Sequence, residues 1–309
     1  MLSWIARRSA LPVEGCEMFR GSYVALVTPF QADGDLDLGK LRDLIEFQIE
    51  NGTHGIVPCG TTGESPTLSH DEHDSVVEET VKAVDGRVQV IAGAGSNSTA
   101  EALRLTRHAK AVGADGALVI TPYYNKPTQE GLVRHFTTVA DEVDIPIVMY
   151  NVPGRTGSDM LAATVGRVAG HPNIAAIKEA TGDLRRTSEV IAACRGEEFV
   201  VLSGEDSVTF PMMSLGGKGV ISVVANVDPK RMAQMCDAFE SGDYGESQRL
   251  HYELLPLACD LFIETNPIPA KTSLEMMGML NGVMRLPLCE MGAENVIQLR
   301  ATLEISGLL

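Results

Sequence analysis

Lys178 is the residue with the clearest chemical potential in this sequence, because it closes an apolar run, IAAIK, at residues 174–178. A free lysine has a pKa of about 10.4, so only about one amine in 2,500 is neutral at pH 7. Burial in an apolar site lowers that pKa, and the neutral amine can then form a Schiff base with a carbonyl compound. The position also allows an ordinary alternative, in which Lys178 pairs with Glu179 or Glu205, or extends to the solvent.

Several polar residues elsewhere in the chain can assist such an amine. They are Tyr150, Thr61, Thr62 and Arg155. A phenol beside an imine can move protons, threonine hydroxyls and amides can bind a carboxylate, and an arginine can clamp a carboxylate with two hydrogen bonds. Each also has a structural explanation, as a core tyrosine, a turn or helix cap, and a solvated loop arginine. The residue types alone leave both interpretations open.

The remaining reactive residues do not predict a metal site or disulfides. The cysteines form no C-x-x-C pair and are typical of free thiols in a reducing compartment, so we expect a cytoplasmic protein. Cys236 and Cys259 lie among apolar residues and are expected in the core. His70 and His73 lie three residues apart in an acidic helix start, HDEH, which favours polar contacts over metal coordination. We therefore expect no metal site among these residues.

The elements that must position these residues alternate between short apolar runs and longer helical patterns. The runs begin 20 to 33 residues apart, a spacing typical of β–α units. They start at Tyr23, Gly55, Val88, Gly116, Ile145, Ile174, Phe199 and Gly219. Because most runs are apolar throughout, we expect strands that helices bury on both faces.

Helical patterns between the runs have recognisable starts. Residues 38–50 carry a one-sided apolar stripe. Ser69 followed by Glu72, and Ser98 followed by Glu101, predict capping boxes at the starts of two helices.

Eight strands, each followed by a helix, predict an α/β fold of the (β/α)8 TIM barrel type. Residues 18–227 would form the barrel and residues 228–309 a C-terminal helical domain, because no strand pattern follows the eighth run. A doubly wound open sheet is the alternative, although no G-x-G-x-x-G follows the first strand to bind a dinucleotide.

Composition excludes several classes of partner. Lys and Arg number 25 against 41 Asp and Glu, and the net charge of −16 argues against binding to nucleic acid or to an anionic membrane surface. No apolar run reaches the length of a spanning helix. Residues 1–17 are too weakly apolar for a secretory signal. We expect either a disordered extension or a start codon assigned upstream of Met18, with a short transit peptide as the alternative.

Seven segments, taken together, resemble the dihydrodipicolinate synthase family of pyruvate-dependent class I aldolases, which is related to N-acetylneuraminate lyase. They are GSYVALVTPF (21–30), GTTGES (60–65), TPYYNKPTQEGL (121–132), YNVPGRTG (150–157), IKEATGD (177–183), LSGED (202–206) and GVISVVAN (219–226). The resemblance implies a homotetrameric barrel lyase that condenses pyruvate with aspartate-4-semialdehyde in lysine and diaminopimelate biosynthesis. It implies no cofactor.

The resemblance also implies catalytic roles. Lys178 matches the Schiff-base lysine, and Tyr150 matches the tyrosine that relays protons. Thr62 matches the threonine that is hydrogen-bonded between two tyrosines. Tyr124 matches the second tyrosine, which the neighbouring subunit inserts.

Four further positions match residues that bind the substrates. Thr61 matches the contact to the pyruvyl carboxylate, and Arg155 matches the arginine that holds the semialdehyde's carboxylate. Gly204 and Ile221 match positions whose backbone lines the pyruvate site.

A second set of residues matches the positions that bind lysine as a feedback inhibitor at the subunit interface. These are Ser65, His70, His73, Asn97, Glu101 and Tyr123. The alternative is a set of polar interface residues without a ligand.

Two other functions stay open at this point. A sister aldolase, such as N-acetylneuraminate lyase or a keto-acid aldolase, shares the lysine and the first tyrosine; Thr62, Tyr124 and Arg155 favour the synthase over it. A catalytically silent relative would act as a binding protein, which the intact set of catalytic residues disfavours.

Overall fold

Eight parallel strands close into a barrel in the computed structural model, which describes residues 18–309. Each strand pairs with its sequence neighbours, and β8 pairs with β1. The strands are β1 (Gly21–Ala25), β2 (Gly55–Val57), β3 (Gln89–Gly93), β4 (Gly116–Ile120), β5 (Ile147–Asn151), β6 (Ile174–Glu179), β7 (Val200–Ser203) and β8 (Gly219–Ser222). The predicted TIM barrel is confirmed and the open sheet is wrong. The predictions for residues 1–17 lie outside the described residues.

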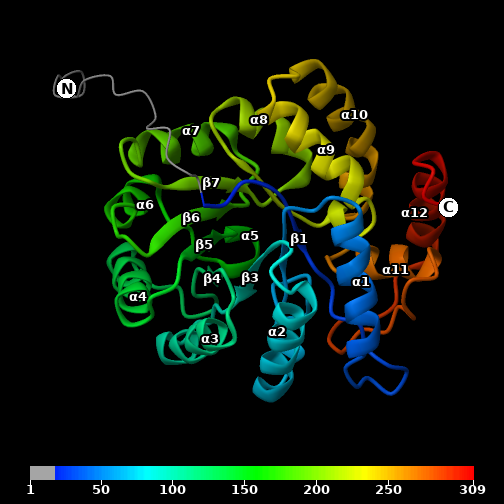
Figure 1. Ribbon diagram of the computed structural model, residues 1–309, viewed down its shortest axis with the longest axis horizontal. Coiled ribbons are helices and arrows are strands. Elements are labelled where there is room, and N and C mark those ends of the chain that lie inside the picture. Colours follow the sequence, from blue (N-terminus) through cyan, green and yellow to red (C-terminus); the bar gives the residue numbers. More distant parts are fainter. Residues whose placement is uncertain (1–17) are drawn as a thin grey trace.

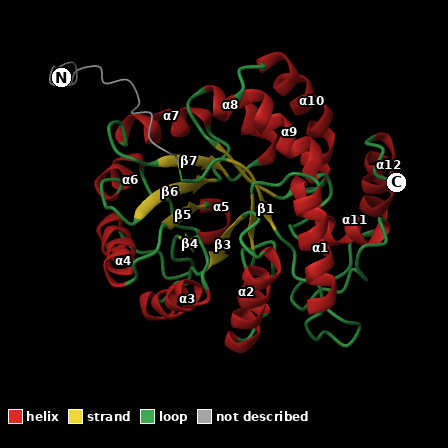
Figure 2. Cartoon of the chain, viewed as in Figure 1, coloured by secondary structure: helices red, strands yellow, loops and turns green. Residues whose placement is uncertain are grey.

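Helices surround the barrel and cover the outer faces of its strands (Figure 1). They are α1 (Leu38–Glu50), α2 (His70–Val84), α3 (Thr99–Val112), α4 (Gln129–Glu142), α5 (Pro153–Thr156), α6 (Ala162–Val168), α7 (Leu184–Ala193) and α8 (Thr209–Ser214). Short 3₁₀ helices follow β2, β7 and β8: η1 (Ser65–Thr67), η2 (Asp206–Val208) and η3 (Val224–Asn226). The long loops at the strand ends are visible in Figure 2.

Side-chain alternation along the strands divides the core into two parts. One set of buried residues fills the barrel interior and includes Val148, Tyr150, Ala176 and Ile221. The larger set lies between the strands and the helices. Every second residue of a strand therefore faces the barrel axis, and the last such residue borders the site.

The helix after β2 begins as predicted, but the helix after β3 does not. At α2, Ser69 accepts from the Glu72 amide at 3.2 Å, and the Glu72 carboxylate accepts from the Ser69 amide at 2.8 Å. At α3, Ser98 makes no capping hydrogen bond. The second capping box is wrong because the Glu101 carboxylate is bound to Ser96 and His70 instead.

Four α-helices follow β8 and form the C-terminal part of the described chain (Figure 1). They are α9 (Pro229–Glu240), α10 (Tyr244–Asp260), α11 (Ile268–Met276) and α12 (Ala293–Ile305). Because α9 packs against β1 as well as α10, it covers the barrel wall. The division of the chain between residues 227 and 228 stays a prediction. Cys236 is buried as expected, whereas Cys259 is exposed on α10, so its predicted core position is wrong.

Among the described residues, no helix combines the length and the apolar character that crossing a membrane requires.

Candidate active site

Lys178 and Tyr150 lie side by side at the ends of adjacent strands. The register of β5 and β6 pairs Tyr150 with Lys178, and both side chains point into the barrel. Lys178 is 5% exposed and Tyr150 is 7% exposed. The Lys178 Nζ lies 4.5 Å from the centroid of the Tyr150 ring. The amine is therefore buried at the mouth of the barrel, with the Tyr150 phenol beside it.

Burial prepares this amine for nucleophilic attack. The pKa of Lys178 is lowered to about 8, chiefly by desolvation; the positive charge of Arg155 acts in the same direction, while the carboxylates of Asp206 and Glu205 oppose the shift. At a pKa of about 8, about one amine in ten is neutral at pH 7, against about one in 2,500 for a free lysine. Within residues 18–309, Lys178 has no carboxylate within 4.0 Å. The salt-bridged alternative is wrong.

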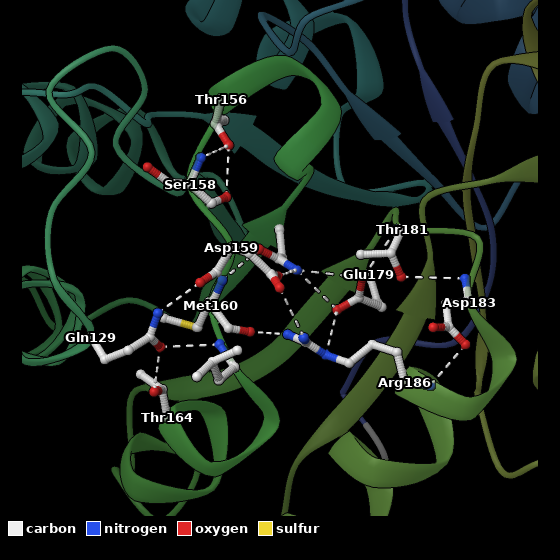
Figure 3. Close-up of polar contacts among 12 residues, drawn as sticks. Gln129, Thr156, Ser158, Asp159, Met160, Thr164, Glu179, Thr181, Asp183 and Arg186 are labelled. Atoms are coloured by element: carbon white, nitrogen blue, oxygen red, sulfur yellow. Dashed lines mark hydrogen bonds and ion pairs between the residues drawn. The ribbon is translucent and has the colours of Figure 1, made fainter.

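Glu179 is unavailable to Lys178 because it faces the opposite side of β6. Its carboxylate accepts from the Thr181 amide at 3.0 Å and from the Asn151 amide at 3.2 Å, and Arg186 lies 3.8 Å away (Figure 3). Arg186 also reaches Asp159 and the Met160 carbonyl. This buried network on the outer face of β5 and β6 fixes the strand ends that present Tyr150 and Lys178.

The two threonines of GTTGES have different partners. Burial raises the pKa of the Tyr150 phenol, while the charge of Arg155 and a hydrogen bond between the Thr61 and Tyr150 hydroxyls oppose the rise. The Thr62 hydroxyl, in contrast, accepts from Asn266 Nδ2 at 2.9 Å and is buried. The structure therefore brings Thr61, rather than Thr62, to Tyr150.

Asn266 connects two loops of the site, and sequence reasoning missed it. Besides Thr62, it contacts Arg155, whose Nη2 donates to the Asn266 carbonyl at 3.3 Å. The Asn266 Oδ1 atom is buried and has no hydrogen-bond partner among the described residues. Nothing in the spacing of NPIP marks this residue, because it joins the site through tertiary contact over about 200 positions.

Gly204 and Asp206 are further neighbours of Lys178, and Ile221 lies in the same barrel interior. A Cβ on Gly204 would lie 3.0 Å from Cε and Cγ of Lys178 and 2.5 Å from the Ala180 side chain, so the lysine stem occupies that space. Ile221 is buried in the barrel interior. Asp206, also missed, accepts from the amides of Val223 and Val224 at 2.9 and 3.3 Å. Burial raises its pKa to about 6. Its place in LSGED, directly after β7, is the signal that would have identified it.

Tyr124 is not brought to Lys178 within the chain. Its side chain is 88% exposed, and its backbone has a φ of 69°, a left-handed conformation that is unfavourable for an aromatic residue. Arg155 is exposed on α5, next to the site.

A cavity of about 240 Å³ adjoins the catalytic residues. Thr61 and Tyr150 are among the residues that line it. Five of the six residues matched to inhibitor binding line it as well: Ser65, His70, His73, Glu101 and Tyr123. Asn97, the sixth, lies outside this lining, and its carbonyl accepts from the Asn125 side chain at 2.9 Å.

Charge and free hydrogen-bonding atoms are both present in this cavity. Glu101 accepts from His70 Nε2 across 2.7 Å, and hydrogen bonds from Ser96 and His70 lower its pKa. Burial lowers the pKa of His73 to about 4, so this imidazole is neutral at pH 7. Its Nε2 has no partner among the described residues. Within the same part of the chain, no group of three or more His, Cys, Asp or Glu residues is arranged to hold a metal.

Comparisons with known proteins agree over almost the whole chain. The model of the dihydrodipicolinate synthetase family matches residues 18–306. The 4-hydroxy-tetrahydrodipicolinate synthase of Geobacter metallireducens is 58% identical over 287 residues, covering 93% of this chain and 98% of the relative. The relatives are lyases, which makes this chain an enzyme of that class.

Solved structures give the same result. The pyruvate complex of the Acinetobacter baumannii dihydrodipicolinate synthase has a TM-score of 0.92 and 45% identity, covering 94% of this chain and 99% of that one. The lysine-bound enzyme of Cyanidioschyzon merolae has a TM-score of 0.91 and 40% identity, covering 95% and 100%. The barrel, the buried lysine and these similarities lead to one conclusion: the chain belongs to the dihydrodipicolinate synthase family.

Proposed function

We propose that this chain condenses pyruvate with aspartate-4-semialdehyde through a Schiff base on Lys178. One observation carries the proposal: a lysine with a pKa of about 8 is buried at the end of a barrel strand, next to a phenol. The pyruvate-bound relative supports the identity of the first substrate. The proposed reaction calls for no metal and no organic cofactor.

The reaction begins with attack of the neutral Lys178 amine on the ketone carbon of pyruvate. Loss of water gives an imine, whose protonated nitrogen withdraws electrons, so that the methyl group can release a proton and become an enamine. The enamine carbon bonds to the aldehyde carbon of the second substrate, and the aldehyde oxygen gains a proton. The amine of the second substrate then replaces Lys178 at the imine carbon, which closes the ring and frees the lysine.

Proton transfer in these steps falls to Tyr150 and its neighbours. Tyr150 lies beside the amine and shares a hydrogen bond with Thr61. We assign the relay to Thr61 because Thr62 is occupied by Asn266. Gly204 and Ile221 border the space for the pyruvyl group.

Arg155 and Asn266 suit the second substrate, which carries a carboxylate and an ammonium group. The exposed Arg155 guanidinium can bind the carboxylate with two hydrogen bonds. The unpartnered Oδ1 of Asn266 can accept a hydrogen bond from the ammonium group.

Tyr124 supports a role for assembly in the reaction. Tyr124 is 88% exposed and has a left-handed backbone, so its ring has little packing within its own chain to offset that unfavourable conformation. We propose that it enters the site of a second copy and extends the Tyr150–Thr61 relay there, within a homotetramer. The five described cysteines are free thiols, which supports a reducing, cytoplasmic location.

The cavity next to Tyr150 is proposed to bind lysine as a feedback inhibitor. Glu101 supplies a carboxylate for an ammonium group, and the neutral His73 supplies an acceptor. The lysine-bound relative supports this assignment. Because Thr61 and Tyr150 line the same cavity, an occupant would contact the relay directly.

The test is pyruvate-dependent consumption of aspartate-4-semialdehyde, coupled to a dihydrodipicolinate reductase. Turnover establishes the proposed reaction. A folded protein that forms the pyruvate imine but does not turn over would instead be a sister aldolase, to be screened with sugar acids and keto acids.

The assignment of Arg155 has its own test in the same assay. Arg155→Ala should raise the KM for the semialdehyde at least tenfold and that for pyruvate less than threefold. Arg134→Ala, on the surface of α4, is the matched control and should change neither. Equal losses for both substrates would remove the assigned role.

A further inference from the structure

The threonine loop, residues 58–64, carries Thr61 and Thr62 and has an unusual backbone. It follows β2, and both Cys59 and Glu64 have positive φ angles, 53° and 54°. These are left-handed conformations that are unfavourable for residues with a Cβ, so surrounding contacts must hold them. Within the loop, the Glu64 amide donates to the Thr61 carbonyl at 3.1 Å. The orientation of Glu64 is therefore coupled to that of Thr61.

A buried ion pair from the C-terminal helices holds Glu64. Its Oε1 lies 2.5 Å from Lys271 Nζ, and both side chains are fully buried. The other oxygen, Oε2, accepts from the Arg285 amide at 3.1 Å. Lys271 also donates to the Val283 carbonyl at 2.7 Å, and its Nζ lies 4.2 Å from the centroid of the Phe30 ring. Every polar atom of the pair is thus used.

The chemistry of this pair points to positioning rather than to stability. Removing two charges from water is costly, and well-packed apolar residues often give equal or greater stability at such a place. What a hydrogen-bonded ion pair adds is a defined orientation of the two side chains. Asn266, five positions before Lys271, holds the neighbouring Thr62 at 2.9 Å. Two contacts from one segment therefore fix the threonine loop from outside the barrel.

We propose that Lys271 is a positioning residue for the reaction. It acts through Glu64 to hold the loop in the conformation that presents the Thr61 hydroxyl to Tyr150. The proposal rests on the proposed function, since it assumes that Tyr150 and Thr61 move protons. It concerns proton removal from bound pyruvate rather than formation of the imine, because Lys178 and its burial do not involve Lys271.

The two steps can be measured separately and without the second substrate. Borohydride trapping in the presence of pyruvate reports the imine on Lys178. Exchange of the pyruvate methyl protons with deuterium, followed by NMR, reports enamine formation. We expect Lys271→Met to trap pyruvate within threefold of the unchanged protein but to exchange its methyl protons at least tenfold more slowly. Arg231→Met, which removes a paired cation from α9 away from the loop, should leave both within twofold.

A double variant separates positioning from stability. Lys271→Met combined with Glu64→Gln removes both charges. This double variant should have the same midpoint of urea unfolding as the unchanged protein, but its exchange of the pyruvate methyl protons should stay as slow as that of Lys271→Met. The proposal is overturned if exchange by folded Lys271→Met stays within twofold of the unchanged protein, or if the double variant regains exchange together with stability. If the unchanged protein exchanges the pyruvate methyl protons but does not consume the semialdehyde, the proposed function is wrong, whereas the proposal for Lys271 is not affected.

Discussion

Lys178 owes its reactivity to its burial in the barrel, and the pH dependence of imine formation measures the resulting change in its pKa. Its pKa of about 8 lies below that of a free lysine because burial disfavours the charged form. Only the neutral amine attacks a ketone, so the rate of imine trapping should rise with pH through about 8 and then level off.

The measurement is the initial rate of borohydride trapping by pyruvate from pH 6 to 10, with mass spectrometry of the labelled peptide. Lys178→Ala is the control and should give no adduct. A midpoint near 10.4 would show that the amine is not desolvated, and an adduct on Lys178→Ala would identify another nucleophile.

Substitution of the two threonines should affect different properties, turnover for Thr61 and stability for Thr62. Thr61→Val removes the hydroxyl that meets Tyr150 and should lower kcat at least tenfold. Thr62→Val leaves the buried Asn266 amide without its acceptor, which costs about 1–3 kcal/mol of stability and should affect kcat less. Steady-state kinetics and urea unfolding of the matched pair provide the measurement. A larger loss of kcat for Thr62→Val would restore Thr62 to the relay.

Sequence predicted some of these residues and not others for a physical reason. Lys178 and Tyr150 end apolar runs, and neighbouring strands of a barrel bring such ends together. Thr61 and Thr62 are adjacent in a loop with left-handed residues, so their directions depend on contacts that no local pattern shows. Asn266 follows α10 and reaches the site only through tertiary packing.

At the scale of elements, helix starts show how a local rule can fail. Ser69 and Ser98 share the same spacing to a glutamate, yet only Ser69 caps its helix. The Glu101 carboxylate instead forms hydrogen bonds with Ser96 and His70, which lie near it in the fold. The strand and helix order was predictable because it follows from hydrophobic periodicity, whereas side-chain partners at helix ends depend on neighbouring elements.

Ser69→Ala and Ser98→Ala therefore make a matched comparison. Ser69→Ala should lower the free energy of unfolding by about 1 kcal/mol, because it exposes the orphan amide of Glu72. Ser98→Ala should change it by less than about 0.5 kcal/mol. Urea unfolding at one fixed protein concentration measures both, since assembly would otherwise shift the midpoint. Equal losses would contradict the assigned caps.

At the scale of the whole molecule, the cavity proposed to bind the inhibitor is lined by two residues of the proposed relay, Thr61 and Tyr150. Glu101→Ala should weaken inhibition by lysine at least tenfold, because it removes the carboxylate that binds an ammonium group, while changing the uninhibited rate less than twofold. Glu130→Ala, on the surface of α4, is the control and should leave inhibition unchanged. A lysine titration of the three proteins in the coupled assay decides it. Inhibition that survives Glu101→Ala would place the inhibitor elsewhere.

The contacts between the threonine loop and the C-terminal helices have a consequence for the order in which the enzyme is made. Thr62 and Glu64 precede their partners Asn266 and Lys271 by 204 and 207 positions. During translation, all eight strands and Lys178 are synthesised before either partner exists. A chain interrupted after β8 therefore carries the nucleophile without the contacts that hold its threonine loop. Those contacts form only when translation nears the C-terminus.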